Sequence, residues 1–217
     1  MGNGFSASGG VHKGDIVSMA PLNSSTMRDW AEGLNEAVGK AWDAAKRQWS
    51  KYGLKGDEID MYVAKMKDGS NVLGFCVIGS SDPNEVGRVA INGDFLNLDN
   101  EAYDVSVASG HNADRGSKSA VEMVFAHEFG HRMTMAIAKD RNISYNNAAE
   151  QIVTQAMRRA SLKGGWKNAA KKVSTYATTK PSEAIAEAMA SYYAHGRNAS
   201  AFARGVEATI REMMRMR

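Results

Sequence analysis

Apolar residues recur at three- and four-residue steps along residues 24–52. Ser24 or Ser25 can cap the start of this segment, and Gly53 lies just past its end. This periodicity predicts an amphipathic helix. Its stripe contains Met27, Trp30, Leu34, Trp42 and Trp49. Three tryptophans on one face indicate a helix that packs on the protein core, with docking on a partner as the alternative.

The pattern changes to strand-like segments between residues 58 and 109. Residues 59–66 and 72–78 are rich in apolar side chains, and the turn-forming residues 67–70 separate them, which predicts a β-hairpin. Residues 86–91 and 105–108 are further strand candidates. We expect a small, mostly antiparallel sheet, whose exposed edge could pair with an extended peptide.

The rest of the chain is predicted to be helical. The apolar residues of the segment 121–138 are spread round the whole helix, which predicts a buried central helix that begins near residues 117–119. Ser119 and Glu122 fit a capping box at its start. Four more helices are expected, at residues 144–162, 166–173, 181–195 and 199–216.

These elements together predict an α+β fold, in which the small sheet packs against the central helix and a helical C-terminal lobe follows. Residues 1–23 are rich in Gly and Ser without periodicity, and are predicted to be a flexible tail. Residues 24–217 are predicted to form a single domain, with a helix-plus-sheet lobe at 24–110 and a helical lobe at 117–217.

Composition limits the class of protein. A chain of 217 residues with 43% apolar content can bury one good core. The single Cys76 excludes an internal disulfide framework, and its apolar surroundings favour a core residue over a nucleophile. No secretion signal and no membrane-spanning apolar run are visible, so we expect a soluble protein, cytoplasmic or virion-associated.

Candidate chemistry begins with the HEFGH stretch at residues 127–131, an instance of the H-E-x-x-H pattern. On a helix, His127 and His131 share one face and can bind one metal ion. Glu128 is the next residue after His127 on the helix, close enough to reach a water beside the metal. Zinc suits this set, because a catalytic zinc takes three protein ligands and leaves a position for water.

A second carboxylate-bearing segment lies downstream. Pro181 belongs in the first turn of a helix, and Glu183 and Glu187 lie four residues apart on one face of it. Spacing permits either Glu as the third metal ligand, with the other orienting a ligand histidine. Tyr176 lies seven residues before Glu183, outside the helix. The alternative is an amphipathic helix with two solvated glutamates.

These residues together resemble the gluzincin metallopeptidases, in the branch typified by the anthrax lethal factor catalytic domain. They are also similar to metallopeptidase-like domains of phage head-morphogenesis proteins. The resemblance covers about residues 117–196. It implies one Zn²⁺ per chain, bound by His127, His131 and Glu183. It further implies that Glu187 supports a ligand histidine and that Tyr176 assists catalysis.

The sequence therefore predicts a zinc metalloendopeptidase that acts on a protein or peptide, of phage or mobile-element type by the resemblance. Glu128 is expected to be the general base. The alternative is a zinc-stabilised structural or binding module, associated with a phage capsid, whose peptidase chemistry is vestigial. Glu128 and Tyr176 favour the enzyme, because neither is needed merely to hold zinc.

Charge is unevenly distributed, although the net charge of +3 is too small by itself to imply nucleic acid. Residues 151–182 contain no Asp or Glu, whereas residues 82–104 contain six acids and only Arg88 as a base. The basic residues of the first segment are Arg158, Arg159, Lys163, Lys167, Lys171, Lys172 and Lys180. This basic block at 158–180 can bind an acidic substrate, nucleic acid or an acidic partner. The alternatives are that it is a solvated helical face or that it pairs with the acidic segment.

His111, in the loop before the central helix, is either an oxyanion donor or a solvated side chain.

Overall fold

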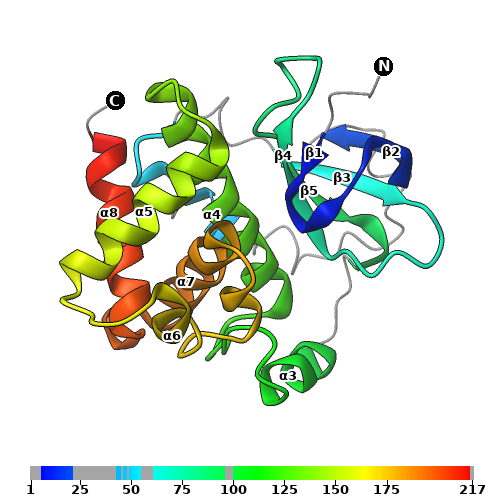
Figure 1. Ribbon diagram of the computed structural model, residues 1–217. Helices are drawn as coiled ribbons and strands as arrows, with labels where there is room; N and C mark the ends of the chain where they lie inside the picture. The colour runs from blue at the N-terminus through cyan, green and yellow to red at the C-terminus, as the bar shows by residue number, and fades with distance from the viewer. Residues whose placement is uncertain are drawn as a thin grey trace. The chain divides into compact units, whose positions relative to one another are not determined.

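The computed structural model describes residues 6–21, 43–44, 46–47, 49–54, 61–95 and 100–215. The chain forms two compact units, Met1–Leu98 and Asp99–Arg217 (Figure 1). We call them the sheet unit and the helical unit. The prediction of an α+β fold with a helical C-terminal part is confirmed. That residues 24–217 form a single domain stays a prediction.

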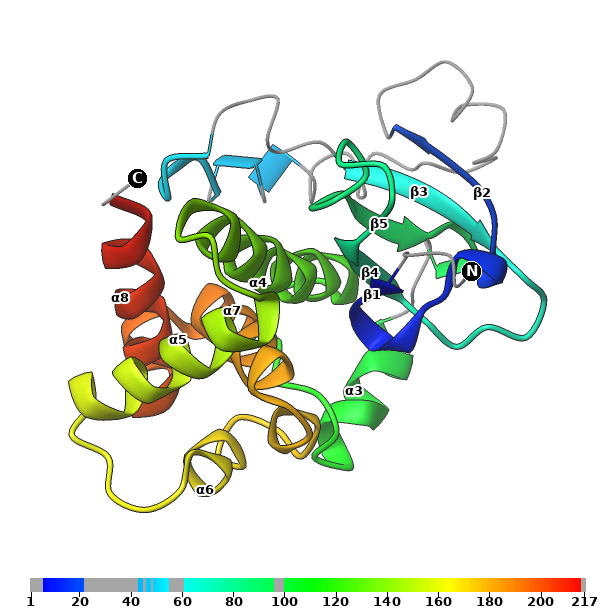
Figure 2. The ribbon, with the colours of Figure 1, turned by 45° about the horizontal axis from the view of Figure 1, so that its top comes forward.

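Among its described residues, the sheet unit contains five strands in the order β1-β4-β5-β3-β2 (Figure 2). All neighbouring strands are antiparallel except β3 and β5, which are parallel. The strands are β1 (Ser6–Ala7), β2 (Ile16–Pro21), β3 (Met61–Met66), β4 (Gly74–Gly79) and β5 (Val89–Asn92). Short 3-10 turns lie at Ser8–Gly10, Lys13–Asp15 and Gly93–Phe95. The predicted hairpin of residues 59–66 and 72–78 is wrong, because β5 lies between the two strands. All four residues of β5 are buried, as suits a central strand.

The predicted flexible tail at residues 1–23 is also corrected, because β1 and β2 form the two outer positions of the sheet. Ala7 and Val11 are buried in the sheet core, and Ile16 and Met19 pack against it. These few apolar residues fix the segment despite its Gly and Ser content. Cys76 is fully buried, as predicted for a core residue.

The predicted helix at residues 24–52 lies largely outside the described residues. Its C-terminal part is helical at residues 43–44, 46–47 and 49–50. Trp49 is buried there, which agrees with the expectation that this face packs on the core. Trp30 and Trp42 lie outside the described residues.

The helical unit contains α3 (Asn100–Ala108), α4 (Ala120–Asp140), α5 (Tyr145–Arg159), α6 (Trp166–Ala170), α7 (Pro181–His195) and α8 (Ala201–Arg215). The 3-10 turns η5 (Tyr176–Thr178) and η6 (Gly196–Asn198) precede and follow α7. Five of the helices occupy predicted positions, but residues 105–108, predicted as a strand, belong to α3. Among the helices described here, none has both the length and the apolar character needed to cross a membrane.

α4 is the central helix of this unit. Its N-terminal capping box is as predicted: the Glu122 amide donates to Ser119 Oγ (3.3 Å), and the Ser119 amide donates to Glu122 Oε2 (2.9 Å). Most of its residues are buried, including Phe125 and Phe129. α4 packs chiefly against α7 (Figure 1).

Gly130 allows α4 and α7 to approach closely. A Cβ atom at Gly130 would lie 2.6 Å from Ala186 Cα and 3.2 Å from its amide nitrogen. α7 presents a run of fully buried small residues near this point: Ala184, Ala186, Ala188 and Ala190. The helices therefore pack almost backbone to backbone, at the same level as the two histidines of α4.

We expect Gly130→Ala to destabilise the helical unit. In an isolated helix this change would stabilise by about 1 kcal/mol. Here the new methyl group meets the α7 backbone, and overpacking typically costs about 1–3 kcal/mol. Gly165→Ala is the control, because its Cβ would have no neighbour within 4 Å. Urea unfolding measures both variants, and a stabilised Gly130→Ala would contradict the packing described.

Candidate metal centre

Three potential ligand atoms from α4 and α7 converge on one point. The Nε2 atoms of His127 and His131 are 3.2 Å apart. Glu183 Oε2 lies 3.3 Å from the first and 3.2 Å from the second. The helical periodicity of α4 places both imidazoles on one face, and the first turn of α7 brings the carboxylate to them. Among the described residues, these three side chains form a group that could hold a metal ion.

The dimensions of this triangle fit zinc. Zinc–ligand distances of about 2.0–2.1 Å in a tetrahedron place the ligand atoms about 3.3–3.4 Å apart. Glu183 Oε2 is buried and accepts no hydrogen bond, although both Nε2 atoms are near it. A buried carboxylate oxygen without a donor is costly unless a cation satisfies it. The donor set of two imidazoles and one carboxylate is also typical of catalytic zinc.

Glu187 orients His127 from the next turn of α7. Its Oε1 lies 2.8 Å from His127 Nδ1, which makes Nδ1 the protonated nitrogen and leaves the Nε2 lone pair for a metal. Its Oε2 accepts a hydrogen bond from the Ala113 amide (2.7 Å). Glu183 and Glu187 therefore occupy different positions, which spacing alone could not distinguish.

The carboxylates also change the protonation of the histidine between them. Burial alone would lower the pKa of His127, but contact with Glu183 and Glu187 and the charge of Glu128 raise it well above its usual value. Burial alone would raise the pKa of Glu183, but the charges of His131 and His127 hold it well below its usual range. The site is thus strongly predisposed to hold positive charge beside Glu183.

Tyr145 contacts the second histidine. Its hydroxyl lies 2.7 Å from His131 Nδ1, and His131 is completely buried. Tyr145 is the first residue of α5, directly after the N-cap Ser144. Sequence analysis did not identify it, because nothing in the local pattern of α5 signals a contact with α4.

Tyr176 lies over His127. Their ring centroids are 5.9 Å apart, and the two rings are nearly parallel, with an interplanar angle of 18°. Two backbone hydrogen bonds hold this segment: the Thr175 amide donates to Gly110 O (2.7 Å) and the Tyr176 amide to His111 O (3.2 Å). Burial, with the charges of Glu183 and Glu128, raises the pKa of the Tyr176 phenol. The phenol therefore remains a proton donor at neutral pH.

Glu128 and His111 are the remaining candidate residues, and their surroundings differ. Glu128 is buried beside the histidines, and its charge acts on both His127 and Tyr176. His111 is exposed, with its ring 5.1 Å from the Tyr176 ring. It is thus near Tyr176 but has no contact that assigns it a role. The structure brings together all six residues singled out by sequence: His127, Glu128, His131, Tyr176, Glu183 and Glu187.

We expect the purified protein to bind about one zinc per chain, and Glu183→Ala to weaken zinc binding far more than Glu187→Ala. Glu183 offers an oxygen to the site, whereas Glu187 meets His127 at Nδ1, the nitrogen that faces away from the site, and loss of such a contact costs about 10–100-fold. Competitive zinc titration measures both variants, with Glu150→Ala on the exposed face of α5 as the control. The reverse ranking would show that the ligand assignment is wrong.

Replacement of Tyr145 by Phe tests the other orienting contact. We expect Tyr145→Phe to keep the fold but to weaken zinc binding by about tenfold, because His131 Nδ1 loses its partner in a buried position. The same titration measures the effect. Unchanged zinc affinity would show that the Tyr145 hydroxyl does not orient His131.

Comparison of the chain with protein-family models finds no match, and neither the curated proteins nor the solved structures include a similar one. The resemblance to gluzincin metallopeptidases therefore rests on the motif residues alone.

Proposed function

We propose that this protein is a zinc-dependent peptidase. The observation that carries the proposal is the convergence of His127 Nε2, His131 Nε2 and Glu183 Oε2 within 3.2–3.3 Å of one another. The buried carboxylate of Glu128 and the protonated phenol of Tyr176 lie next to them. A site that only holds zinc needs the first three residues but not the last two.

Each residue has a definite role in peptide hydrolysis. Zinc held by His127, His131 and Glu183 would supply Lewis acidity, which makes water more acidic and polarises a carbonyl group. The Glu128 carboxylate accepts a proton from the attacking water while the new C–O bond forms. It then delivers this proton to the leaving nitrogen as the C–N bond breaks.

Tyr176 stabilises the negative charge that develops on the carbonyl oxygen. Its hydroxyl remains protonated, because burial and the neighbouring carboxylates raise the phenol pKa. It can thus donate a hydrogen bond to the oxyanion. Its backbone hydrogen bonds to Gly110 and His111 hold the ring in place before substrate binds, so little ordering is needed during the reaction.

We expect Glu128→Gln to abolish turnover while zinc binding and folding persist. Gln matches Glu in shape but cannot accept the proton, and loss of a general base typically costs about 10²–10⁴-fold in rate. Hydrolysis of a mixed peptide library, followed by mass spectrometry, measures turnover. Near wild-type activity in Glu128→Gln would show that Glu128 is not the general base. A folded, zinc-loaded wild type without hydrolysis would favour the zinc-stabilised structural module instead.

For Tyr176→Phe, we expect kcat to fall by about 10²–10³-fold with little change in KM, because the lost hydrogen bond acts only on the developing oxyanion. Tyr193→Phe is the control. The Tyr193 hydroxyl donates to Glu122 Oε1 (2.7 Å) at the start of α4, so its loss should affect stability rather than kcat. Equal kcat values in wild type and Tyr176→Phe would show that the Tyr176 hydroxyl does not stabilise the oxyanion.

A further inference from the structure

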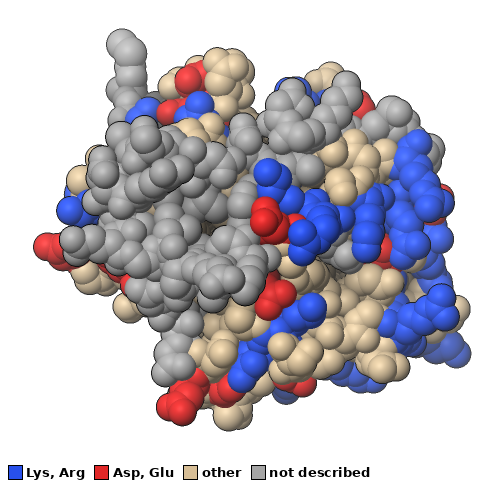
Figure 3. Space-filling view, turned by 180° about the vertical axis from the view of Figure 1, so that it is seen from behind, with Lys and Arg blue, Asp and Glu red and all other residues tan. Residues whose placement is uncertain are grey.

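Seven cations follow one another on the surface of the helical unit, from the end of α5 to the start of α7. We call them the basic run: Arg158, Arg159, Lys163, Lys167, Lys171, Lys172 and Lys180. All seven are exposed. The intervening chain contains no Asp or Glu. Seen from behind, further Lys and Arg side chains gather along the edge of the helical unit on which α8 lies (Figure 3).

The basic run is almost without acidic partners. Arg159 forms an ion pair with Glu212 of α8. Among the described residues of the helical unit, none of the other six forms an ion pair. Uncompensated like charges close together repel one another. An acidic ligand would relieve this repulsion.

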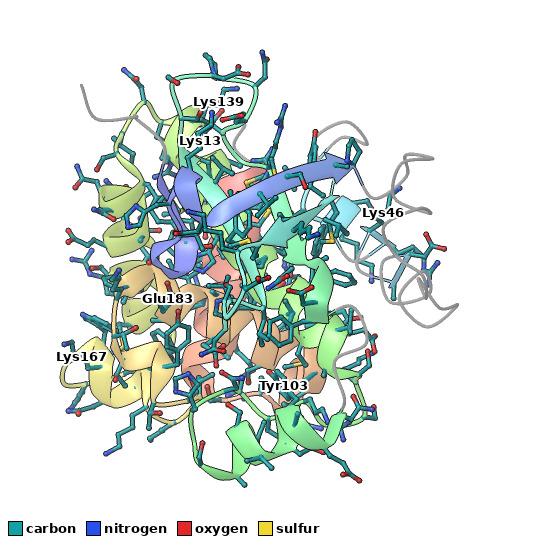
Figure 4. All side chains as sticks on the ribbon, turned by 90° about the vertical axis from the view of Figure 1, so that its right-hand side faces the viewer. Lys13, Lys46, Tyr103, Lys139, Lys167 and Glu183 are labelled. Carbon is teal, nitrogen blue, oxygen red and sulfur yellow. The ribbon has the colours of Figure 1, made fainter. Side chains whose placement is uncertain are left out.

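The basic run leads to the candidate metal centre. α6 lies between Lys163 and Lys171 in the chain and packs against both η5, which carries Tyr176, and α7. Lys180 is the N-cap of α7 and precedes the carboxylate ligand Glu183 by three residues, roughly 5 Å along the helix axis. In Figure 4, Lys167 lies at the margin of the helical unit and Glu183 in its interior.

We propose that the basic run binds an acidic segment of the polypeptide substrate and so guides it to the metal centre. This inference rests on the proposed peptidase function. An acidic polypeptide fits better than a single-stranded nucleic acid, because the two aromatic side chains within residues 158–180, Trp166 and Tyr176, are half-buried and offer little surface on which bases could stack. Trp166, its one tryptophan, is half-buried, and Lys167 Nζ lies 5.7 Å from its ring centroid. The specificity of the enzyme would then include Asp and Glu residues at a distance from the cleaved bond.

Binding to the zinc-loaded Glu128→Gln variant tests this proposal without any need for turnover. The probes are fluorescein-labelled peptides of about twelve residues, (Glu-Ala)n and (Lys-Ala)n, and a single-stranded oligothymidine of similar charge. Fluorescence anisotropy at low and high salt measures their affinities. We expect the acidic peptide to bind at least about tenfold more tightly than the basic peptide, and more weakly as salt rises.

A charge-neutralised variant locates the binding surface. Lys167→Gln/Lys171→Gln/Lys172→Gln should weaken binding of the acidic peptide about tenfold, since three exposed ion pairs, each individually weak, are lost. The control variant is Lys65→Gln/Lys67→Gln/Lys139→Gln, which removes three equally exposed charges outside the basic run. Lys139 lies well away from Lys167 in Figure 4. Thermal unfolding confirms that both variants are folded.

Three outcomes would overturn the proposal. The first is equal affinity of the acidic peptide for the two triple variants. The second is no salt-sensitive binding of the acidic peptide, as expected for a merely solvated surface. The third is tighter binding of the oligothymidine than of the acidic peptide, which would make this a nucleic-acid surface. Failure of the peptidase proposal is separate, because it would appear as absent hydrolysis in the wild type while binding of the acidic peptide persists.

Discussion

The close contact between α4 and α7 at Gly130 and Ala186 is the constraint on which the site depends. Only a residue without a side chain allows the α7 backbone to lie where it does, since a Cβ atom there would be 2.6 Å from Ala186 Cα. This contact places Glu183 and Glu187 one turn apart on the helix that faces His127 and His131. Ligand atoms must be held within about 0.5 Å of their working positions, and two rigid helices in direct contact achieve this better than loops.

The two candidate ligand histidines have chemically different partners. The carboxylate of Glu187 accepts from His127 and also holds the Ala113 amide, so it joins α7, α4 and the loop before α4. His131 instead meets the phenol hydroxyl of Tyr145. The same loop supplies the carbonyl groups of Gly110 and His111 that hold Tyr176 over His127. The orientation of a ligand and the position of the proposed oxyanion donor thus depend on one hydrogen-bonded network.

Local periodicity made much of the helical unit predictable. The 3.6-residue repeat placed His127 next to His131, and Pro181 marked the start of α7 correctly. Long-range contacts were not predictable, because no local pattern encodes them. Spacing could not choose between Glu183 and Glu187, and nothing in α5 pointed to Tyr145. In the H-E-x-x-H pattern Gly130 is only a variable position, although it sets the distance between α4 and α7.

The sheet unit was predicted less well for a related reason. Residues 59–66 and 72–78 are neighbours in sequence, but each pairs with β5, so the predicted hairpin does not form. The Gly- and Ser-rich start of the chain concealed two edge strands whose pairing is non-local. Residues 105–108 alternate like a strand, yet Val105 is 70% exposed on α3. Short apolar segments carry too little periodic signal to separate the two structures.

The central claim is that α4 and α7 build one zinc site from two imidazoles and a carboxylate. X-ray absorption spectroscopy at the zinc edge tests it most directly, because it reports the ligand types without any assumption about activity. We expect one zinc per chain, with two imidazoles and otherwise oxygen ligands at about 2.0–2.1 Å. A sulfur ligand at about 2.3 Å, or a zinc with fewer than two imidazoles, would contradict it.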